Sequence, residues 1–154
     1  MTNNKEYELN PNNDTHLNTI LSFIGSYPRN KIVFYKERLL DITPIDVGQL
    51  LSQSLFNFNN ERQLPMKAYD EINRIFDKAV FYHPNFGKTL AIANLGILFE
   101  PDLKQNFKTI IDNHSTNNLL LIEWEGEIES DVLFFMSKER GIKININNLS
   151  HIAL

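Results

Sequence analysis

One stretch of the sequence has the residue types of a phosphate-binding loop. Tyr82 to Thr89 reads YHPNFGKT and ends in Gly87-Lys88-Thr89. In the pattern GxxxxGK[ST], the glycines let backbone N–H groups point at phosphate, the lysine meets the terminal phosphates and the hydroxyl meets Mg²⁺. The first glycine is replaced by Tyr82, whose Cβ and ring would stand where the chain must turn tightly against phosphate. We therefore favour an ordinary loop that happens to contain Gly-Lys-Thr.

Under the alternative, in which Tyr82–Thr89 is a working loop, the chain would be a nucleotide-binding ATPase regulator. Leu90–Phe99 would then be the helix after the loop, and Leu119–Glu123 would be a Walker B strand that ends in an acid.

Acidic residues alternate along the connection from Glu123 to Asp131. Paired carboxylates can hold a metal in a nuclease, but no lysine stands nearby in the Glu-x-Lys arrangement. We therefore expect a solvated strand end or a surface that faces a partner, with Glu125 and Glu127 as contact residues. Trp124 is either a packed anchor at a strand end or an interface hot spot, and packing is the favoured interpretation.

Basic residues gather near one predicted strand and could contact nucleic acid. They are Arg29, Lys31, Lys36 and Arg38. Glu37 lies among them and the net charge of the chain is −4, so we expect weak, salt-sensitive association at most. The four histidines are too scattered for metal-ligand spacing, and there is no cysteine. The sequence predicts no metal site, no cofactor and no catalytic triad.

The elements that must position these residues follow from the apolar pattern. Apolar runs within Lys31–Lys36, Leu90–Ala93 and Leu119–Glu123 predict buried parallel strands. Further extended pieces are expected at Leu39–Ile42, Val132–Met136 and Ile142–Ile146. Amphipathic segments predict helices that begin at Asp14 or Thr15, at Thr43-Pro44, at Pro65 and near Leu103. This alternation predicts a three-layer α/β fold with a mainly parallel sheet.

The length of 154 residues suits one domain, and we predict a flexible N-terminal segment over residues 1–14 and a single α/β domain over 15–154. The absence of cysteine fits a reducing compartment, and no apolar run approaches the ~18 residues of a membrane span. The sequence therefore predicts a soluble, cytoplasmic protein.

The order of these elements and the residues from Leu90 to Lys104 resemble the BrxF family of small P-loop proteins from type 3 BREX phage-defence systems. In that family a Walker B strand ends in Asp-Asn, a short apolar helix follows, and the chain then reads Phe-Asp-Pro-x-Leu-Lys. The corresponding segments here are Ala93-Asn94, Leu95–Leu98 and Phe99–Lys104. Leu40–Leu55, Ile122–Gly126, Leu133–Phe135 and Ile142–Ile146 are similar to other family segments.

The sequence departs from that family where the chemistry would be. The family's phosphate-binding loop would follow Lys31–Lys36, but Glu37–Leu40 follows instead, and no glycine occurs between Gly25 and Gly48. The Walker B aspartate corresponds to Ala93, which cannot hold a magnesium-bound water. We therefore expect a degenerate P-loop NTPase-like fold, a pseudo-ATPase that neither binds ATP tightly nor hydrolyses it.

The resemblance implies a non-catalytic accessory subunit that binds other proteins of an anti-phage defence complex. The surfaces expected to meet partners are the acidic connection, with Trp124, Glu125 and Glu127, and the loop side of the sheet around Asn94 and Gly96. A homo-oligomer is an open alternative, and so is a nucleic-acid-binding module, although direct binding of nucleic acid is not expected.

Overall fold

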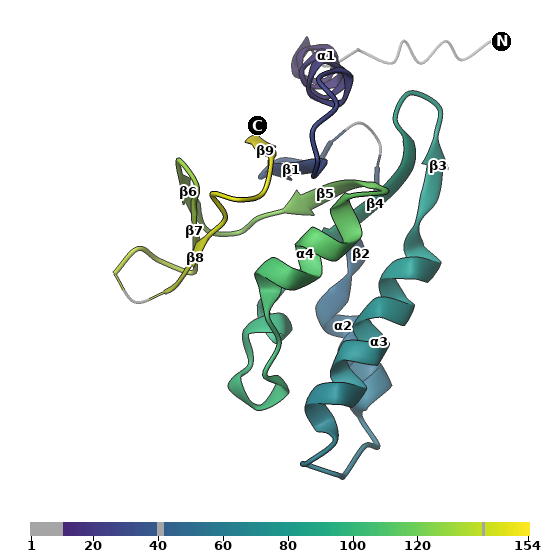
Figure 1. Ribbon diagram of the computed structural model, residues 1–154, viewed down its shortest axis with the longest axis vertical. Coiled ribbons are helices and arrows are strands. Elements are labelled where there is room, and N and C mark those ends of the chain that lie inside the picture. Colours follow the sequence, from purple (N-terminus) through teal and green to yellow (C-terminus); the bar gives the residue numbers. More distant parts are fainter. Residues whose placement is uncertain (1–10, 40–41, 140) are drawn as a thin grey trace, which may run out of the picture.

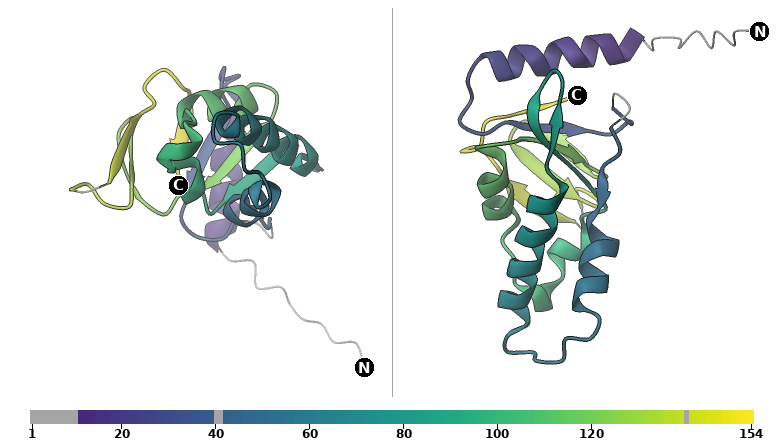
Figure 2. Two further views of the ribbon diagram at one scale, coloured as in Figure 1. Left: turned by 90° about the horizontal axis from the view of Figure 1, so that it is seen from below. Right: turned by 90° about the vertical axis from the view of Figure 1, so that its right-hand side faces the viewer.

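The computed structural model describes residues 11–39, 42–139 and 141–154. A central sheet separates helix α1 (Pro11–Gly25) from α2 (Val47–Leu55), α3 (Leu64–Ala79) and α4 (Phe107–Ser115), as Figures 1 and 2 show. Two short 3-10 helices, η1 (Gly96–Phe99) and η2 (Pro101–Leu103), precede α4. The predicted α/β fold with helices on both faces of the sheet is confirmed.

The central sheet contains β1 (Ile32–Tyr35), β2 (Ile45–Asp46), β4 (Gly87–Ala93), β5 (Leu119–Glu123) and β9 (His151–Ala153). Their order across the sheet is β2-β4-β5-β1-β9, and all of these pairs are parallel. Strand β3 (Phe81–His83) pairs antiparallel with the first residues of β4. The sheet is therefore mainly parallel, as predicted, and the predicted strands at its centre are β1, β4 and β5.

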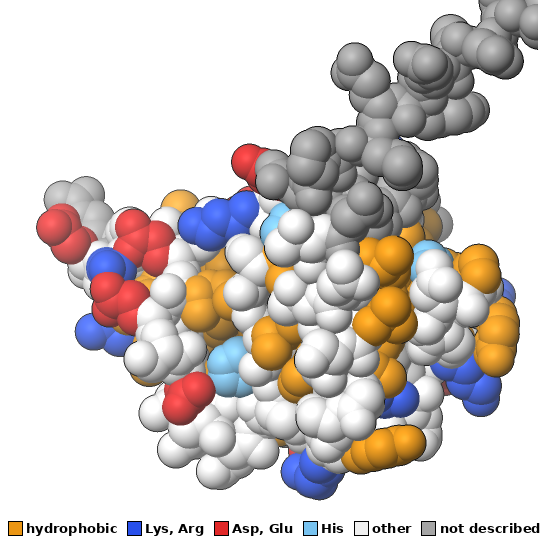
Figure 3. All heavy atoms as spheres, turned by 90° about the horizontal axis from the view of Figure 1, so that it is seen from above, with side chains coloured by type: hydrophobic (Ala, Val, Ile, Leu, Met, Phe, Trp, Pro, Cys, Tyr) orange, Lys and Arg blue, Asp and Glu red, His pale blue; other side chains and the backbone are white. Residues whose placement is uncertain are grey.

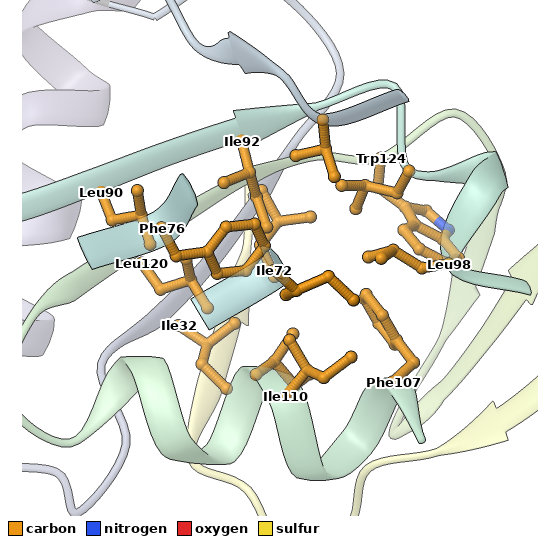
Figure 4. Close-up of a cluster of buried hydrophobic side chains, with 14 of the residues drawn as sticks. Ile32, Ile72, Phe76, Leu90, Ile92, Leu98, Phe107, Ile110, Leu120 and Trp124 are labelled. Carbon is orange, nitrogen blue, oxygen red and sulfur yellow. The ribbon is translucent and has the colours of Figure 1, made fainter. Parts of the chain in front are cut away.

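The central strands are buried on both faces because apolar side chains point to each side. On one face, Ile32, Leu90 and Leu120 pack against α3 and α4, as Figure 4 shows. On the other face, Val33 and Leu121 pack with Ile20 of α1. A sheet that is apolar on both faces needs a layer on each side.

A second sheet, of β6 (Glu127–Glu129), β7 (Val132–Phe135) and β8 (Ile142–Asn145), is antiparallel throughout. Trp124 joins it to the main core, with ring centroids 6.2 Å from Phe34 and 6.0 Å from Phe135. A Cβ at Gly126 would lie 1.7 Å from the Phe134 carbonyl oxygen, so only glycine allows this approach. Since Leu133 belongs to the main buried cluster, the two sheets share one core.

Several predicted boundaries were wrong. The helix expected at Thr43-Pro44 begins at Val47, because Asp46 caps it by accepting a 2.9 Å hydrogen bond from the Gln49 backbone N–H. The helix expected near Leu103 begins at Phe107, where Asn106 is the capping residue. The first helix begins at Pro11 rather than at Asp14 or Thr15.

Two strand assignments also need correction. The closing strands expected at Val132–Met136 and Ile142–Ile146 exist as β7 and β8, but they form the second sheet, and β9 closes the main one. In the extended piece expected at Leu39–Ile42, residues 40 and 41 lie outside the described part. Leu39 and Ile42 are buried residues of a connection and not of a strand.

Within the described residues, no helix has both the length and the apolar character needed to cross a membrane.

We expect Trp124→Ala to lower the free energy of unfolding by about 3–5 kcal/mol, because a large indole leaves a cavity where the two sheets meet. Met66→Ala is the control, since this side chain is 71% exposed, and a change below about 0.5 kcal/mol is expected. Urea unfolding of the three proteins measures both values. A loss below about 1 kcal/mol for Trp124→Ala would contradict the role of this residue in the core.

Candidate functional site

The carboxyl edge of the parallel strands is the first place to look for a site, because ligands of open α/β sheets bind outside these strand ends. Lys36 follows β1, Asp46 ends β2, Asn94 follows β4, and Trp124 follows β5. The parallel register of β2, β4, β5 and β1 brings these residues to one edge of the sheet.

Ala93 and Asn94, the residues compared above with the end of a Walker B strand, make contacts within the chain. Ala93 ends β4 and pairs in register with Asp46. The next residue, Asn94, has a φ of 55° and donates a 2.7 Å hydrogen bond from Nδ2 to Asp46 Oδ1. Its carbonyl oxygen accepts a 3.0 Å hydrogen bond from the Gly48 N–H. Asn94, predicted as a partner contact, therefore ties the end of β4 to the start of α2.

Asp46 places a carboxylate beside Asn94, and this carboxylate is engaged within the chain. Hydrogen bonds from the Gln49 backbone N–H and the Asn94 side chain hold the pKa of Asp46 below its usual value. Both bonds go to Oδ1. Asp46 was missed as a site residue, although the spacing Asp46-x-x-Gln49 is that of a capping box and could have revealed it.

The connection after β1 does not form a phosphate-binding loop. Lys36, Glu37 and Arg38 are exposed, whereas Leu39 and Ile42 turn inward against the sheet. The Arg38 guanidinium donates a 3.2 Å hydrogen bond to Thr43 Oγ1. No helix follows β1 in the described part of this connection, so no helix N-terminus faces the edge there.

The alternative interpretation of Tyr82–Thr89 as a phosphate-binding loop is wrong, because this segment is a β-hairpin. Tyr82 pairs with Lys88 and His83 with Gly87 in antiparallel register. Gly87 has a φ of 74° at the turn, and the buried Thr89 donates from Oγ1 to the Gly87 carbonyl oxygen at 3.0 Å. A strand, β4, follows in place of the helix that a phosphate-binding loop requires.

The acidic connection is less open than its composition suggests. Trp124 is 2% exposed, and its Nε1 donates to the Glu127 carbonyl oxygen at 3.3 Å, so packing is confirmed and the indole is not a surface hot spot. Lys138 forms ion pairs with both Glu127 and Glu129. Glu125 is exposed, and so are Glu127 and Asn94 among the predicted partner residues.

A pocket of about 460 Å³ lies where the two sheets meet at the ends of β1 and β9. Lys36, Glu127, Glu129 and Lys138 line it together with Tyr35. Acidic and basic side chains stand side by side on the small sheet, at the left of Figure 3. Glu129 and Glu127 raise the pKa of Lys138, so its ammonium is charged, and these two carboxylates balance the charge. The described residues contain no group of three or more carboxylates and histidines able to hold a metal.

The predicted basic cluster does not form one patch. Arg29 and Lys31 precede β1, and Lys36 and Arg38 follow it, so the two pairs stand at opposite edges of the sheet. Arg29 also lies 3.7 Å from the Asp112 carboxylate. This arrangement offers no continuous track for a phosphate backbone.

Comparisons with protein-family models, with curated proteins and with solved structures give no match for this chain.

We expect Asn94→Asp to destabilise the protein by about 0.5–1.5 kcal/mol at neutral pH, because it removes a donor and places a second carboxylate beside Asp46 at an exposed position where water screens the charges. The low pKa of Asp46 contributes stability that is present above the pKa of the unfolded chain and is lost as the pH falls through the folded pKa. The variant should therefore approach the wild-type protein as the pH falls towards about 4.

Urea unfolding at the two pH values measures this effect, with Asn94→Gly as the control because glycine keeps the left-handed backbone without adding charge. If Asn94→Asp equalled the wild type at neutral pH, the contact between Asn94 and Asp46 would not stabilise this edge.

Proposed function

We propose that this protein is a non-catalytic accessory subunit, a pseudo-ATPase of P-loop type that works by binding other proteins in a bacterial anti-phage defence complex. The defence role rests on the resemblance of Leu90–Lys104 to the BrxF family. The loss of catalysis rests on the residues at the carboxyl edge.

The order of the strands supports a P-loop origin. Counted along the chain, the five parallel strands β1, β2, β4, β5 and β9 lie across the sheet as 2-3-4-1-5. This order is typical of the class of P-loop ATPases in which an additional strand separates the strand before the phosphate-binding loop from the Walker B strand. In that arrangement β1 would precede the loop and β4 would carry the Walker B acid.

The observation that carries the proposal is what occupies these two positions. After β1 the connection is glycine-free and packs Leu39 and Ile42 against the sheet. Ala93, the last residue of β4, carries no carboxylate, and Asn94 after it is hydrogen-bonded to Asp46. At these two positions the described residues supply neither the N-terminus of a helix after β1 nor an acid at Ala93.

We expect no ATP hydrolysis and no heat of binding when the full chain is titrated with ATP and Mg²⁺ in a calorimeter. Lys88→Ala is the matched variant, because Lys88 is the exposed lysine of the Gly-Lys-Thr hairpin. Micromolar binding to the wild type that Lys88→Ala abolished would contradict the pseudo-ATPase proposal.

The partner-binding role is tested by purifying the full chain from its native host at its natural expression level. We expect it to co-purify in stoichiometric amounts with larger proteins of the same defence system. A protein that stayed monomeric and partnerless, in a host that kept its phage protection when the protein was deleted, would overturn the proposal.

A further inference from the structure

We propose that the groove between α2 and α3 is the docking site for an acidic amphipathic helix of a partner protein. The inference rests on the proposed function, because it names the surface through which an accessory subunit would bind, and it adds the chemistry of the bound segment.

Helices α2 and α3 pack side by side at the β2 edge of the sheet, as seen in Figure 1. The groove lies between them. It has a volume of about 550 Å³, which is within the range of ligand-binding clefts. Its lining comes from β2, α2 and α3: Ile45, Leu50, Gln53, Ser54, Arg74, Ile75, Lys78 and Ala79. A second hollow of about 290 Å³ continues along α2 through Gln53 to Phe56.

The exposed face of α2 has the composition of an interface. The helix from Val47 to Leu55 contains no charged residue. Leu50 is 37% exposed and Phe56, directly after the helix, is 83% exposed. Protein interfaces are depleted of charged residues at their centre and enriched in aromatic residues and arginine. An uncharged helix face with an exposed phenylalanine, next to Arg74, fits this description.

The charged side chains that line the groove are positive, although the chain carries a net charge of −4. Arg74 and Lys78 line the groove, and none of the lining residues is acidic. Glu71 lies beside Arg74, whose Nε donates to it at 2.8 Å, and hydrogen bonds from Arg74 and Lys67 lower its pKa to about 2. Lys78 makes no ion pair within the described residues, so its charge is available to an acidic partner.

A helix fits this groove better than an extended strand. Strand β2 has only two residues, so its free edge offers few backbone hydrogen bonds to an added strand. The nine residues of α2 span roughly 14 Å, which is long enough to accept two to three turns of a bound helix. Apolar residues spaced at i, i+3 or i+4, and i+7 would face Leu50 and Phe56, and flanking carboxylates would meet Arg74 and Lys78.

The test is photo-crosslinking in the native host with the full chain. A photoreactive phenylalanine derivative replaces Gln53 in the groove, and in separate proteins it replaces Glu125 on the acidic connection or Thr109 on α4. We expect a crosslink from Gln53 to a partner peptide with the helical apolar spacing and acidic flanks. Mass spectrometry of the crosslinked peptide identifies its sequence.

The roles of charge and shape are tested by further substitutions in the protein that carries the photoreactive residue in place of Gln53. Phe56→Asp should abolish the crosslink, and Lys78→Glu should reduce its yield severalfold. Lys36→Glu, an equal charge change after β1 and outside the groove, should leave the yield unchanged. Thermal unfolding of each variant confirms that it folds, and the high exposure of Phe56 makes its replacement compatible with the core.

The outcomes separate this inference from the proposed function. Crosslinks to a partner from Glu125 or Thr109, but not from Gln53, would overturn the groove and leave the accessory role standing. A Gln53 crosslink to a second copy of this chain, or to a peptide without acidic residues, would also overturn the inference. Absence of crosslinks from every position, together with absence of co-purifying proteins, would overturn both.

Discussion

The burial of β1, β4 and β5 on both faces is the constraint on which the rest of the structure depends. The apolar side chains of these strands leave no face that water could cover, so each face needs its own layer. On one side α2, α3 and α4 supply that layer, since they are the crossovers between parallel strands. On the other side, the described residues of the connection after β1 form no crossover helix. Helix α1, which precedes the sheet in the chain, covers this face together with Leu39 and Ile42.

This arrangement explains how the chain can lack a phosphate-binding loop and still fold. In a P-loop domain the helix after the loop would both hold the nucleotide and cover the sheet. Here α1 and the buried residues of the connection after β1 supply the cover. The ends of β2 and β4 are also stabilised by contacts within the chain, because Asp46 caps α2 and accepts the hydrogen bond of Asn94. Asp46 and Asn94 therefore stabilise the carboxyl edge.

The parts of the fold that the sequence predicted are those set by local pattern. The apolar runs of β1, β4 and β5 and the amphipathic spacing of α3 are visible without tertiary information. Strand β9 was missed because His151–Ala153 is short and owes its place to pairing with β1, far away in the chain. The apolar pattern of β7 and β8 predicted strands but could not say which sheet they would join.

In the candidate site, too, some features can be predicted from the local sequence and others depend on tertiary contacts. The missing glycines and Ala93 can be read directly from the sequence, and so can the doubt about Tyr82 in the Gly-Lys-Thr segment. The contact between Asn94 and Asp46 depends on the register of β2 against β4, which a two-residue strand does not reveal in the sequence. The burial of Trp124 depends on rings brought in by β1 and β7, so the sequence could only state packing and interface as alternatives.

The distribution of charge connects these points to recognition. Several charged groups at or near the carboxyl edge have partners within the chain: Asp46 with Asn94, and Glu127 and Glu129 with Lys138. The outer face of α2 shows the opposite condition, with exposed apolar side chains, no charge on the helix and a cationic border on α3. Burial of exposed apolar surface against another molecule lowers the free energy of the system. The side of the sheet formed by α2 and α3 is therefore better suited to binding another protein than the strand ends where a nucleotide would sit.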